Sequence, residues 1–250
     1  LTDKTYGTAT MEHQFFVDGP LREADAYVNA PGASTPSWRN YLVGSLGAGG
    51  RAVFALDVTD SMSMGPSSVR WEISNDDDAD IGYVLTPIKV GVLKNGRWVA
   101  IFGNGFSSTN GYATLFVVDI ENAASSNAVV RAAAVKKLNV DTAGSNGLGG
   151  VTIIHDASGQ IDTVYAGDLK GRMWKLNYSA TASSYFEIDG GAALFTATDT
   201  SGTAQPITSS PAVYNHSMGG KMLVFGTGKL FSTADATDTS AQSVYGVWDK

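Results

Sequence analysis

The chain has 250 residues, of which 43% are hydrophobic, and it contains 29 glycines, 7 prolines and no cysteine. Its 17 basic residues are outnumbered by 24 acidic ones, and no run of lysine or arginine offers a footprint for nucleic acid or for an anionic membrane surface. The lack of cysteine excludes disulfides, thiol catalysis and thiolate metal sites, and no apolar stretch is long enough to span a bilayer.

Two features of the N-terminal region are informative: the way the chain begins, and two candidate strands. It opens Leu1-Thr2-Asp3-Lys4, without an initiator methionine or a charged-then-apolar leader, so we interpret it as a piece of a larger protein with any export signal upstream. His13–Val17 and Ala24–Val28 have the composition of short strands. We expect them to contribute to a blade that is completed elsewhere in the protein.

From residue 41 onward, one pattern occurs four times. An apolar run ends in glycine, a turn follows, and an aromatic-containing run then ends in Asp or Asn. The glycines, which are 59, 64 and 59 residues apart, are Gly44, Gly103, Gly167 and Gly226. The closing residues are Asp57, Asp119, Asn177 and Asp249. A repeat of this length with about four short strands is typical of a β-propeller blade, which buries its two apolar faces only by stacking against neighbours.

The repeat therefore predicts an all-β fold, a β-propeller of four-stranded blades. We expect residues 1–250 to form one propeller domain with about four visible blades, and ring closure cannot be predicted because closed rings usually have more blades. The closing Asp or Asn should cap the following turn. Residues 123–137 alone have some helical periodicity, and we interpret them as a loop or short strand. The aromatics expected to fill the wedges between blades are Phe54, Phe116 and Trp174.

Motifs along nearly the whole chain resemble, in order, those of the PilY1/PilC family. The motifs include Phe16-Val17-Asp18-Gly19, Leu42 to Arg51, Phe102 to Ser108, Tyr165 to Gly171, and Phe225 to Lys229. The resemblance implies a non-catalytic propeller at the C-terminal end of an exported protein, located at the pilus tip, on the outer membrane or outside the cell. It also implies minor pilins and a host or surface receptor as partners, and roles in type IV pilus biogenesis, control of retraction and adhesion.

The resemblance further suggests a calcium loop. Family members often carry Asp-x-Asp-x-Asp-Gly-x-x-Asp before the Tyr-Ala-Gly-Asp strand, and calcium takes six to eight oxygen ligands. Here Ile154 occupies the first position, where it cannot bind metal, and Gly159 keeps the turn position. We predict a degenerate calcium loop, or alternatively a hairpin turn that has lost its metal. The candidate ligands are Asp156, Ser158, Gln160 and Asp162.

Two other motifs have simpler interpretations. Asp76, Asp78 and Asp80 alternate along a second acidic segment, but Ile81 replaces the loop glycine, which favours a solvated acidic loop over a calcium site. Gly47-Ala48-Gly49-Gly50 resembles a phosphate-binding loop, yet a strand follows it where such a loop needs a helix, so these are turn glycines.

No catalytic constellation is evident. The chain has no nucleophile elbow, and its histidines lack metal-ligand spacing. Arg97 and Lys229 could bind a ligand and have no evident partner. Tryptophans recur at blade positions in a manner similar to quinoprotein dehydrogenases: Trp71, Trp98, Trp174 and Trp248. A quinoprotein-like oxidoreductase fragment therefore remains one alternative, and a glycan- or matrix-binding propeller unrelated to pili remains another.

Overall fold

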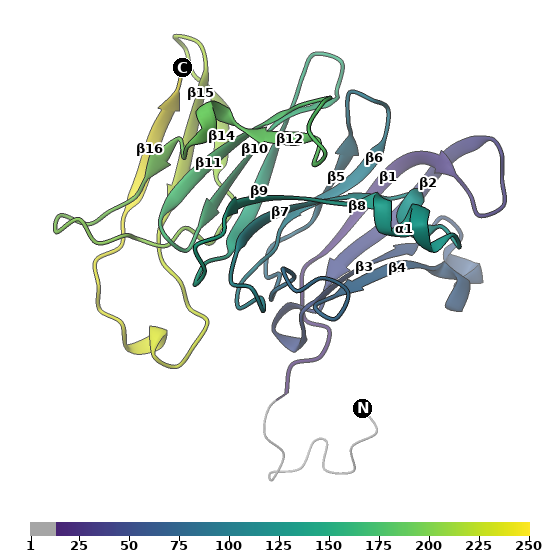
Figure 1. The fold of residues 1–250 in the computed structure, drawn as a ribbon, viewed down its shortest axis with the longest axis horizontal. Helices are drawn as coiled ribbons and strands as arrows, with labels where there is room; N and C mark the ends of the chain where they lie inside the picture. Colours follow the sequence, from purple (N-terminus) through teal and green to yellow (C-terminus); the bar gives the residue numbers. More distant parts are fainter. Residues whose placement is uncertain (1–13) are drawn as a thin grey trace.

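The computed structural model describes residues 14–250, which form four antiparallel sheets arranged side by side in sequence order (Figure 1). Each sheet is a meander of neighbouring strands, and we number the sheets blade 1 to blade 4. The all-β prediction is confirmed. Blade 1 contains β1 (Leu21–Asn29), β2 (Pro36–Ser45), β3 (Ala52–Asp57) and β4 (Val69–Ser74).

Blades 2 and 3 repeat this plan of four consecutive strands, and blade 4 contains three strands. Blade 2 contains β5 (Lys89–Val92), β6 (Trp98–Gly103), β7 (Ala113–Asp119) and β8 (Val135–Asp141). Blade 3 contains β9 (Leu148–His155), β10 (Ile161–Asp168), β11 (Arg172–Tyr178) and β12 (Phe186–Ile188), with β13 (Phe195–Thr196) also paired to β11. Blade 4 contains β14 (Ala212–Asn215), β15 (Lys221–Gly226) and β16 (Val244–Asp249).

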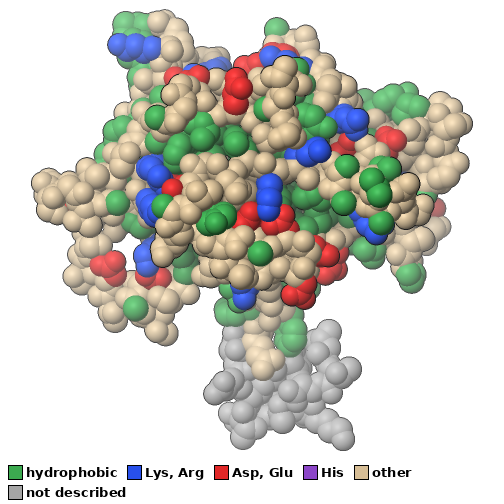
Figure 2. All heavy atoms as spheres, viewed as in Figure 1, with side chains coloured by type: hydrophobic (Ala, Val, Ile, Leu, Met, Phe, Trp, Pro, Cys, Tyr) green, Lys and Arg blue, Asp and Glu red, His purple; other side chains and the backbone are tan. Residues whose placement is uncertain are grey.

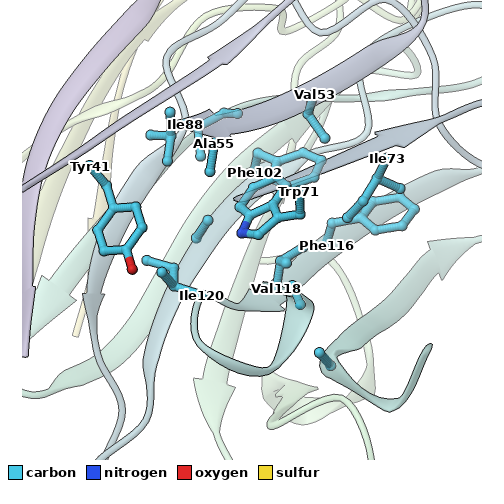
Figure 3. Close-up of a cluster of buried hydrophobic side chains, with 14 of the residues drawn as sticks. Tyr41, Val53, Ala55, Trp71, Ile73, Ile88, Phe102, Phe116, Val118 and Ile120 are labelled. Atoms are coloured by element: carbon cyan, nitrogen blue, oxygen red, sulfur yellow. The ribbon is translucent and has the colours of Figure 1, made fainter. Parts of the chain in front are cut away.

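The first core lies between blades 1 and 2. Successive side chains of a strand point to opposite faces of its sheet, so one face of blade 1 carries Tyr41, Val53 and Trp71 into contact with blade 2 (Figure 3). Blade 2 contributes Phe102 and Phe116, whose rings stack with centroids 5.4 Å apart. Each such side chain stabilises the stack by about 1.5–3 kcal/mol when fully buried.

Two more cores join blade 2 to blade 3 and blade 3 to blade 4. Trp174 of β11 packs in the second core, and Phe225 of β15 packs in the third. The predicted wedge position is confirmed for Phe116 and Trp174. Phe54 differs, because it lies on the face of blade 1 that points away from blade 2 and is partly exposed.

Strand pairing shows that the four glycines of the repeat are not all equivalent. Phe54 pairs with Gly44, whereas Phe116 pairs with Phe102, the residue before Gly103. Ser45 therefore occupies in blade 1 the place that Gly103 occupies in blade 2. The aromatic of the third strand marks the equivalent positions more faithfully than the glycine does.

The glycine position is set by the approach of the next blade. A Cβ on Gly103 would lie 2.1 Å from the backbone oxygen of Gly149 in β9, and a Cβ on Gly167 would lie 2.2 Å from Ile207 on the way to blade 4. The same position in blade 4, Gly226, has no atom within 4 Å. Small residues are thus needed where another blade packs.

The N-terminal strand completes blade 1 of this chain. β1 pairs with β2 along its whole length, from Leu21 opposite Gly44 to Asn29 opposite Pro36. The expectation of a blade completed elsewhere is therefore wrong for residues 24–28. Residues 14–17 form no strand, and His13 lies outside the described residues.

A short helix, α1 (Ala128–Ala134), replaces part of the predicted loop or short strand. The Asn127 side chain caps it by accepting hydrogen bonds from the backbone N–H groups of Val129 at 2.9 Å and Val130 at 3.3 Å. Arg131 in its last turn donates to the Ser125 carbonyl at 2.8 Å. The strand part of the prediction is correct, because β8 begins at Val135.

Candidate functional site

The predicted calcium residues lie in the tight hairpin between β9 and β10. The Asp156 N–H donates to the Gln160 carbonyl at 2.8 Å, and Gly159 adopts a positive φ of 77° that favours glycine. One carboxylate oxygen of Asp156, Oδ1, accepts from the N–H groups of Ser158 at 2.8 Å and Gln160 at 3.1 Å. These bonds make Asp156 an internal cap of the turn.

A lysine from the neighbouring blade reaches the two carboxylates of this hairpin. Lys94, in the turn between β5 and β6, donates a hydrogen bond to Asp162 Oδ1 and lies 3.9 Å from Asp156 Oδ2. The hydrogen bond from Lys94 holds the pKa of Asp162 below its usual range. Ile154 packs against the third core. The side chains as folded do not fit a calcium ion that needs six to eight oxygens.

The second acidic segment, residues 76–80, forms ion pairs at its C-terminal end and is a solvated loop at its N-terminal end. Lys137 of β8 donates to Asp78 at 2.8 and 2.9 Å and to Asp80 at 2.7 Å. Asp80 is 1% exposed and also accepts from the Asn110 side chain at 2.7 Å. Only Asp76 and its neighbour Asp77 match the predicted solvated loop. The partner of Asp80 is 57 residues away in sequence, so local spacing could not indicate it.

The Tyr-Ala-Gly-Asp motif ends in a buried carboxylate. Asp168 is 0% exposed and accepts hydrogen bonds from the Arg172 N–H at 3.0 Å and Nε at 2.9 Å. It also accepts from the Trp174 indole at 3.0 Å and from the Lys170 N–H at 2.9 Å. Charge-assisted bonds of this kind are about twice as strong as neutral ones. Asp168 therefore fixes the β10–β11 turn.

Asp141 at the end of β8 connects this turn to blade 2. It pairs with Lys170 at 2.8 Å and Arg172 at 2.7 Å, and the Asn146 side chain donates to both Asp141 at 2.8 Å and Asp168 at 3.1 Å. Burial acts to raise the pKa of Asp141, but the bonds from Lys170, Arg172 and Asn146 outweigh it and hold the pKa far below its usual range. This network was not predicted from the sequence. The one feature of the sequence that marks it is the Tyr-Ala-Gly-Asp motif, which ends in Asp168.

Asn104, which follows β6, is a buried link between blades. Its side-chain oxygen accepts from the N–H groups of Thr114 at 3.0 Å and Leu148 at 2.9 Å. Its amide donates to the carbonyls of Asp80 at 2.7 Å and Tyr112 at 3.0 Å. Every hydrogen-bonding site of this amide is used, as a buried polar side chain requires.

Two of the closing aspartates cap their turns as predicted. Asp57 accepts from the N–H of Thr59 at 3.1 Å, and Asp119 accepts from that of Asn122 at 3.0 Å. Asp249 has another role, because it accepts from the Tyr165 hydroxyl of blade 3 at 2.5 Å.

The two cations for which the sequence indicated no partner are both paired. Arg97 contacts Asp119 at 2.5 Å, and Lys229 donates to Asp235 in the loop between β15 and β16. The expectation that they lack partners is therefore wrong. Across the face shown in Figure 2, basic and acidic side chains lie close to one another and form no broad basic patch.

A hollow of about 450 Å³ lies between the innermost strands β1, β5 and β9. Arg22, Lys89 and His155 line it, and in the described part of the chain its lining includes no tryptophan. The four repeated tryptophans lie elsewhere: Trp71 and Trp174 are buried between blades, Trp98 packs against the first core, and Trp248 stacks on a histidine. The arrangement places no tryptophan of residues 14–250 where it could stack on a quinone in this hollow.

Loops at one end of the blades form a second, apolar hollow of about 480 Å³. Phe106 of blade 2 stacks against Phe231 of the long β15–β16 loop, with ring centroids 4.2 Å apart. Leu85 and Leu230 also line this hollow and are exposed. Exposed apolar clusters are common at protein contact sites. No helix in the described residues is long and apolar enough to cross a membrane.

Comparison with known proteins gives one consistent result. A family model described as the PilY1 beta-propeller domain matches residues 1–250. The type IV pilus biogenesis factor PilY1 homolog of Xylella fastidiosa is 37% identical over 95% of this chain, and PilY1 of Pseudomonas aeruginosa PAO1 is 38% identical over 95%. The chain spans only 16% and 21% of those relatives.

A solved structure agrees with these sequence relatives. The crystal structure of the Pseudomonas aeruginosa PilY1 C-terminal domain superposes with a TM-score of 0.77 at 36% identity, covering 94% of this chain and 49% of that chain. The four sheets are thus propeller blades, as the repeat predicted. From the match over all 250 residues and the shared fold, the chain belongs to the PilY1 β-propeller domain family.

Proposed function

We propose that this chain is a non-catalytic propeller module of a type IV pilus biogenesis factor. The observation that carries the proposal is the family match over residues 1–250, together with relatives that are named as type IV pilus biogenesis factors. The repeated apolar and aromatic residues pack the blades against one another. The buried carboxylates of the chain, such as Asp80 and Asp168, are held by hydrogen bonds.

The proposed setting is the cell surface, with the protein at the pilus tip, on the outer membrane or outside the cell. Minor pilins and other pilus components are the proposed partners on the bacterial side, and a host or surface receptor is the proposed partner in adhesion. The module would support pilus assembly and oppose retraction. The exposed apolar loops around Leu85 and Leu230 are suited to such contacts.

A piliation assay tests the proposal. A strain that lacks the full gene is compared with its parent, and the sheared pilus fraction is blotted for this protein. We expect loss of surface pili, recovery of pili when retraction is also disabled, and the protein in the sheared fraction of the parent. Normal piliation together with absence from that fraction would contradict the proposal. Among residues 14–250, no contact favours the oxidoreductase or the pilus-independent glycan-binding alternative.

A further inference from the structure

The β9–β10 hairpin of blade 3 is attached to blade 2 at the point where Lys94 reaches it. Leu93, the residue before Lys94, forms a parallel bridge with Ile161, the residue before Asp162. Both apolar side chains are fully buried in the second core. The bridge therefore holds the backbones from which Lys94 and Asp162 extend close to one another, and the two side chains, 37% and 45% exposed, meet at the surface.

The ammonium also has a defined position within the hairpin. It donates to Asp162, lies 3.9 Å from Asp156 and lies 5.9 Å from the centre of the Tyr178 ring. A cation held by two carboxylates and an aromatic face is well matched electrostatically.

We propose that the Lys94 ammonium is the resident cation of this hairpin, joining blade 2 to blade 3 where the family's loop would hold calcium. Calcium would have to displace Lys94 and compete with the two N–H groups that bond Asp156 Oδ1. It would gain only two carboxylates, because Ile154 supplies no side-chain oxygen. The blade contact would then be permanent and independent of the calcium concentration.

The test measures thermal unfolding and calcium binding of the purified protein in a chelator and in calcium raised to about 5 mM, above the dissociation constants of weak extracellular calcium modules. The variants are Lys94→Gln, Lys94→Arg and Asp162→Asn. Lys229→Gln is the matched control, since Lys229 is another exposed lysine paired with one aspartate, but within a single loop. Calorimetric titration with calcium chloride gives the second readout.

We expect the wild-type protein to unfold at the same temperature with and without calcium. Lys94→Gln should unfold at a lower temperature and should regain part of the loss when calcium is added, because its two carboxylates are then unpaired. Lys94→Arg should behave like the wild type, and Lys229→Gln should show no calcium response. A calcium-dependent rise in the wild type that disappears in Asp162→Asn would overturn the proposal, as would identical behaviour of Lys94→Gln and the wild type.

Discussion

Asp168 shows how one side chain can determine a turn that sequence motifs only mark. Its carboxylate is fully buried and receives bonds from Arg172, Trp174 and Asn146. Arg172 and Trp174 are near in sequence, but Asn146 comes from the segment that leads into β9. A buried carboxylate is tolerated only when such donors surround it.

Replacement of Asp168 by Asn should therefore be strongly destabilising. The change keeps the shape of the side chain but removes the buried charge that pairs with Arg172, and it replaces an acceptor oxygen by an NH2 group that faces other donors; Arg172 keeps only its pairing with Asp141. We expect the free energy of unfolding to fall by about 3 kcal/mol, measured by chemical denaturation. Asp76→Asn, at an exposed acidic position, should change it by no more than about 0.5 kcal/mol. Equal effects of the two changes would show that the network contributes little.

The network also predicts how stability depends on pH. In the folded protein the pKa of Asp141 lies below its unfolded value of about 3.9, because the bonds from Lys170 and Arg172 outweigh burial. The unfolded state therefore binds more protons in this range, and the stabilisation is present above about pH 4 and lost as pH falls through the folded pKa. We expect Asp141→Asn to weaken the acid-dependent loss of stability in denaturation curves between pH 2 and 6, a range of about four units centred on the unfolded pKa of about 3.9.

At the scale of strands and helices, the repeat predicted most of the architecture. The second and third strands of each blade were evident because an apolar run ending in glycine recurs in each, followed by a turn and an aromatic-containing run. The exact register of the strands was not evident. Gly44 lies one position before the residue of blade 1 that is equivalent to Gly103 of blade 2, and only strand pairing reveals this shift. A single glycine cannot show which face of a strand it occupies.

Helix α1 was missed for a different reason. Its seven residues are too few to give a clear period of 3.6, and isolated helices of this length are marginal without capping or packing. The Asn127 cap supplies local stabilisation, and the start of β8 immediately afterwards explains why the segment also resembled a strand. In the same way, Lys94 and Lys137 were not associated with the acidic loops because their partners lie in other elements.

Glycines at blade contacts allow a paired test of the stacking. Gly103→Ala would place a methyl group 2.1 Å from the Gly149 oxygen, whereas Gly226→Ala would meet open space. We expect the first change to lower the free energy of unfolding by about 1–3 kcal/mol or more, and the second to alter it by less than about 0.5 kcal/mol. Denaturant titration of the purified protein measures both. Similar losses in the two variants would mean that the contact at Gly103 is not what requires glycine.

At the scale of the whole molecule, the face of blade 4 that points away from blade 3 differs from the corresponding faces of the blades before it. Leu115 and Met173, the partners of Gly103 and Gly167, are 0% exposed beneath the next blade. Val244, the partner of Gly226, is 79% exposed. Tyr214 and Val224 on the same face are also exposed. The sequence could not distinguish this face, because the repeat pattern is the same in all four blades.

This face should make the chain of residues 1–250 associate through apolar contacts. We expect Val244→Lys to reduce self-association in sedimentation experiments and to leave the unfolding temperature nearly unchanged, since the side chain has few contacts to lose. β16 is also the edge strand of blade 4, and lysine on an edge strand hinders strand pairing between molecules. If the variant associates as strongly as the wild type, another surface is responsible.

The open face of blade 4 has a consequence for how such an arc is made. Each blade covers one face of the blade before it and at the same time presents a new apolar face of its own, so neighbouring blades stabilise one another only pairwise. If blades fold in order as the chain is synthesised, the apolar face that is exposed to solvent is always that of the last blade to have folded. A chaperone that protects this folding would have to bind the most recently folded blade and release it when the next blade packs against it.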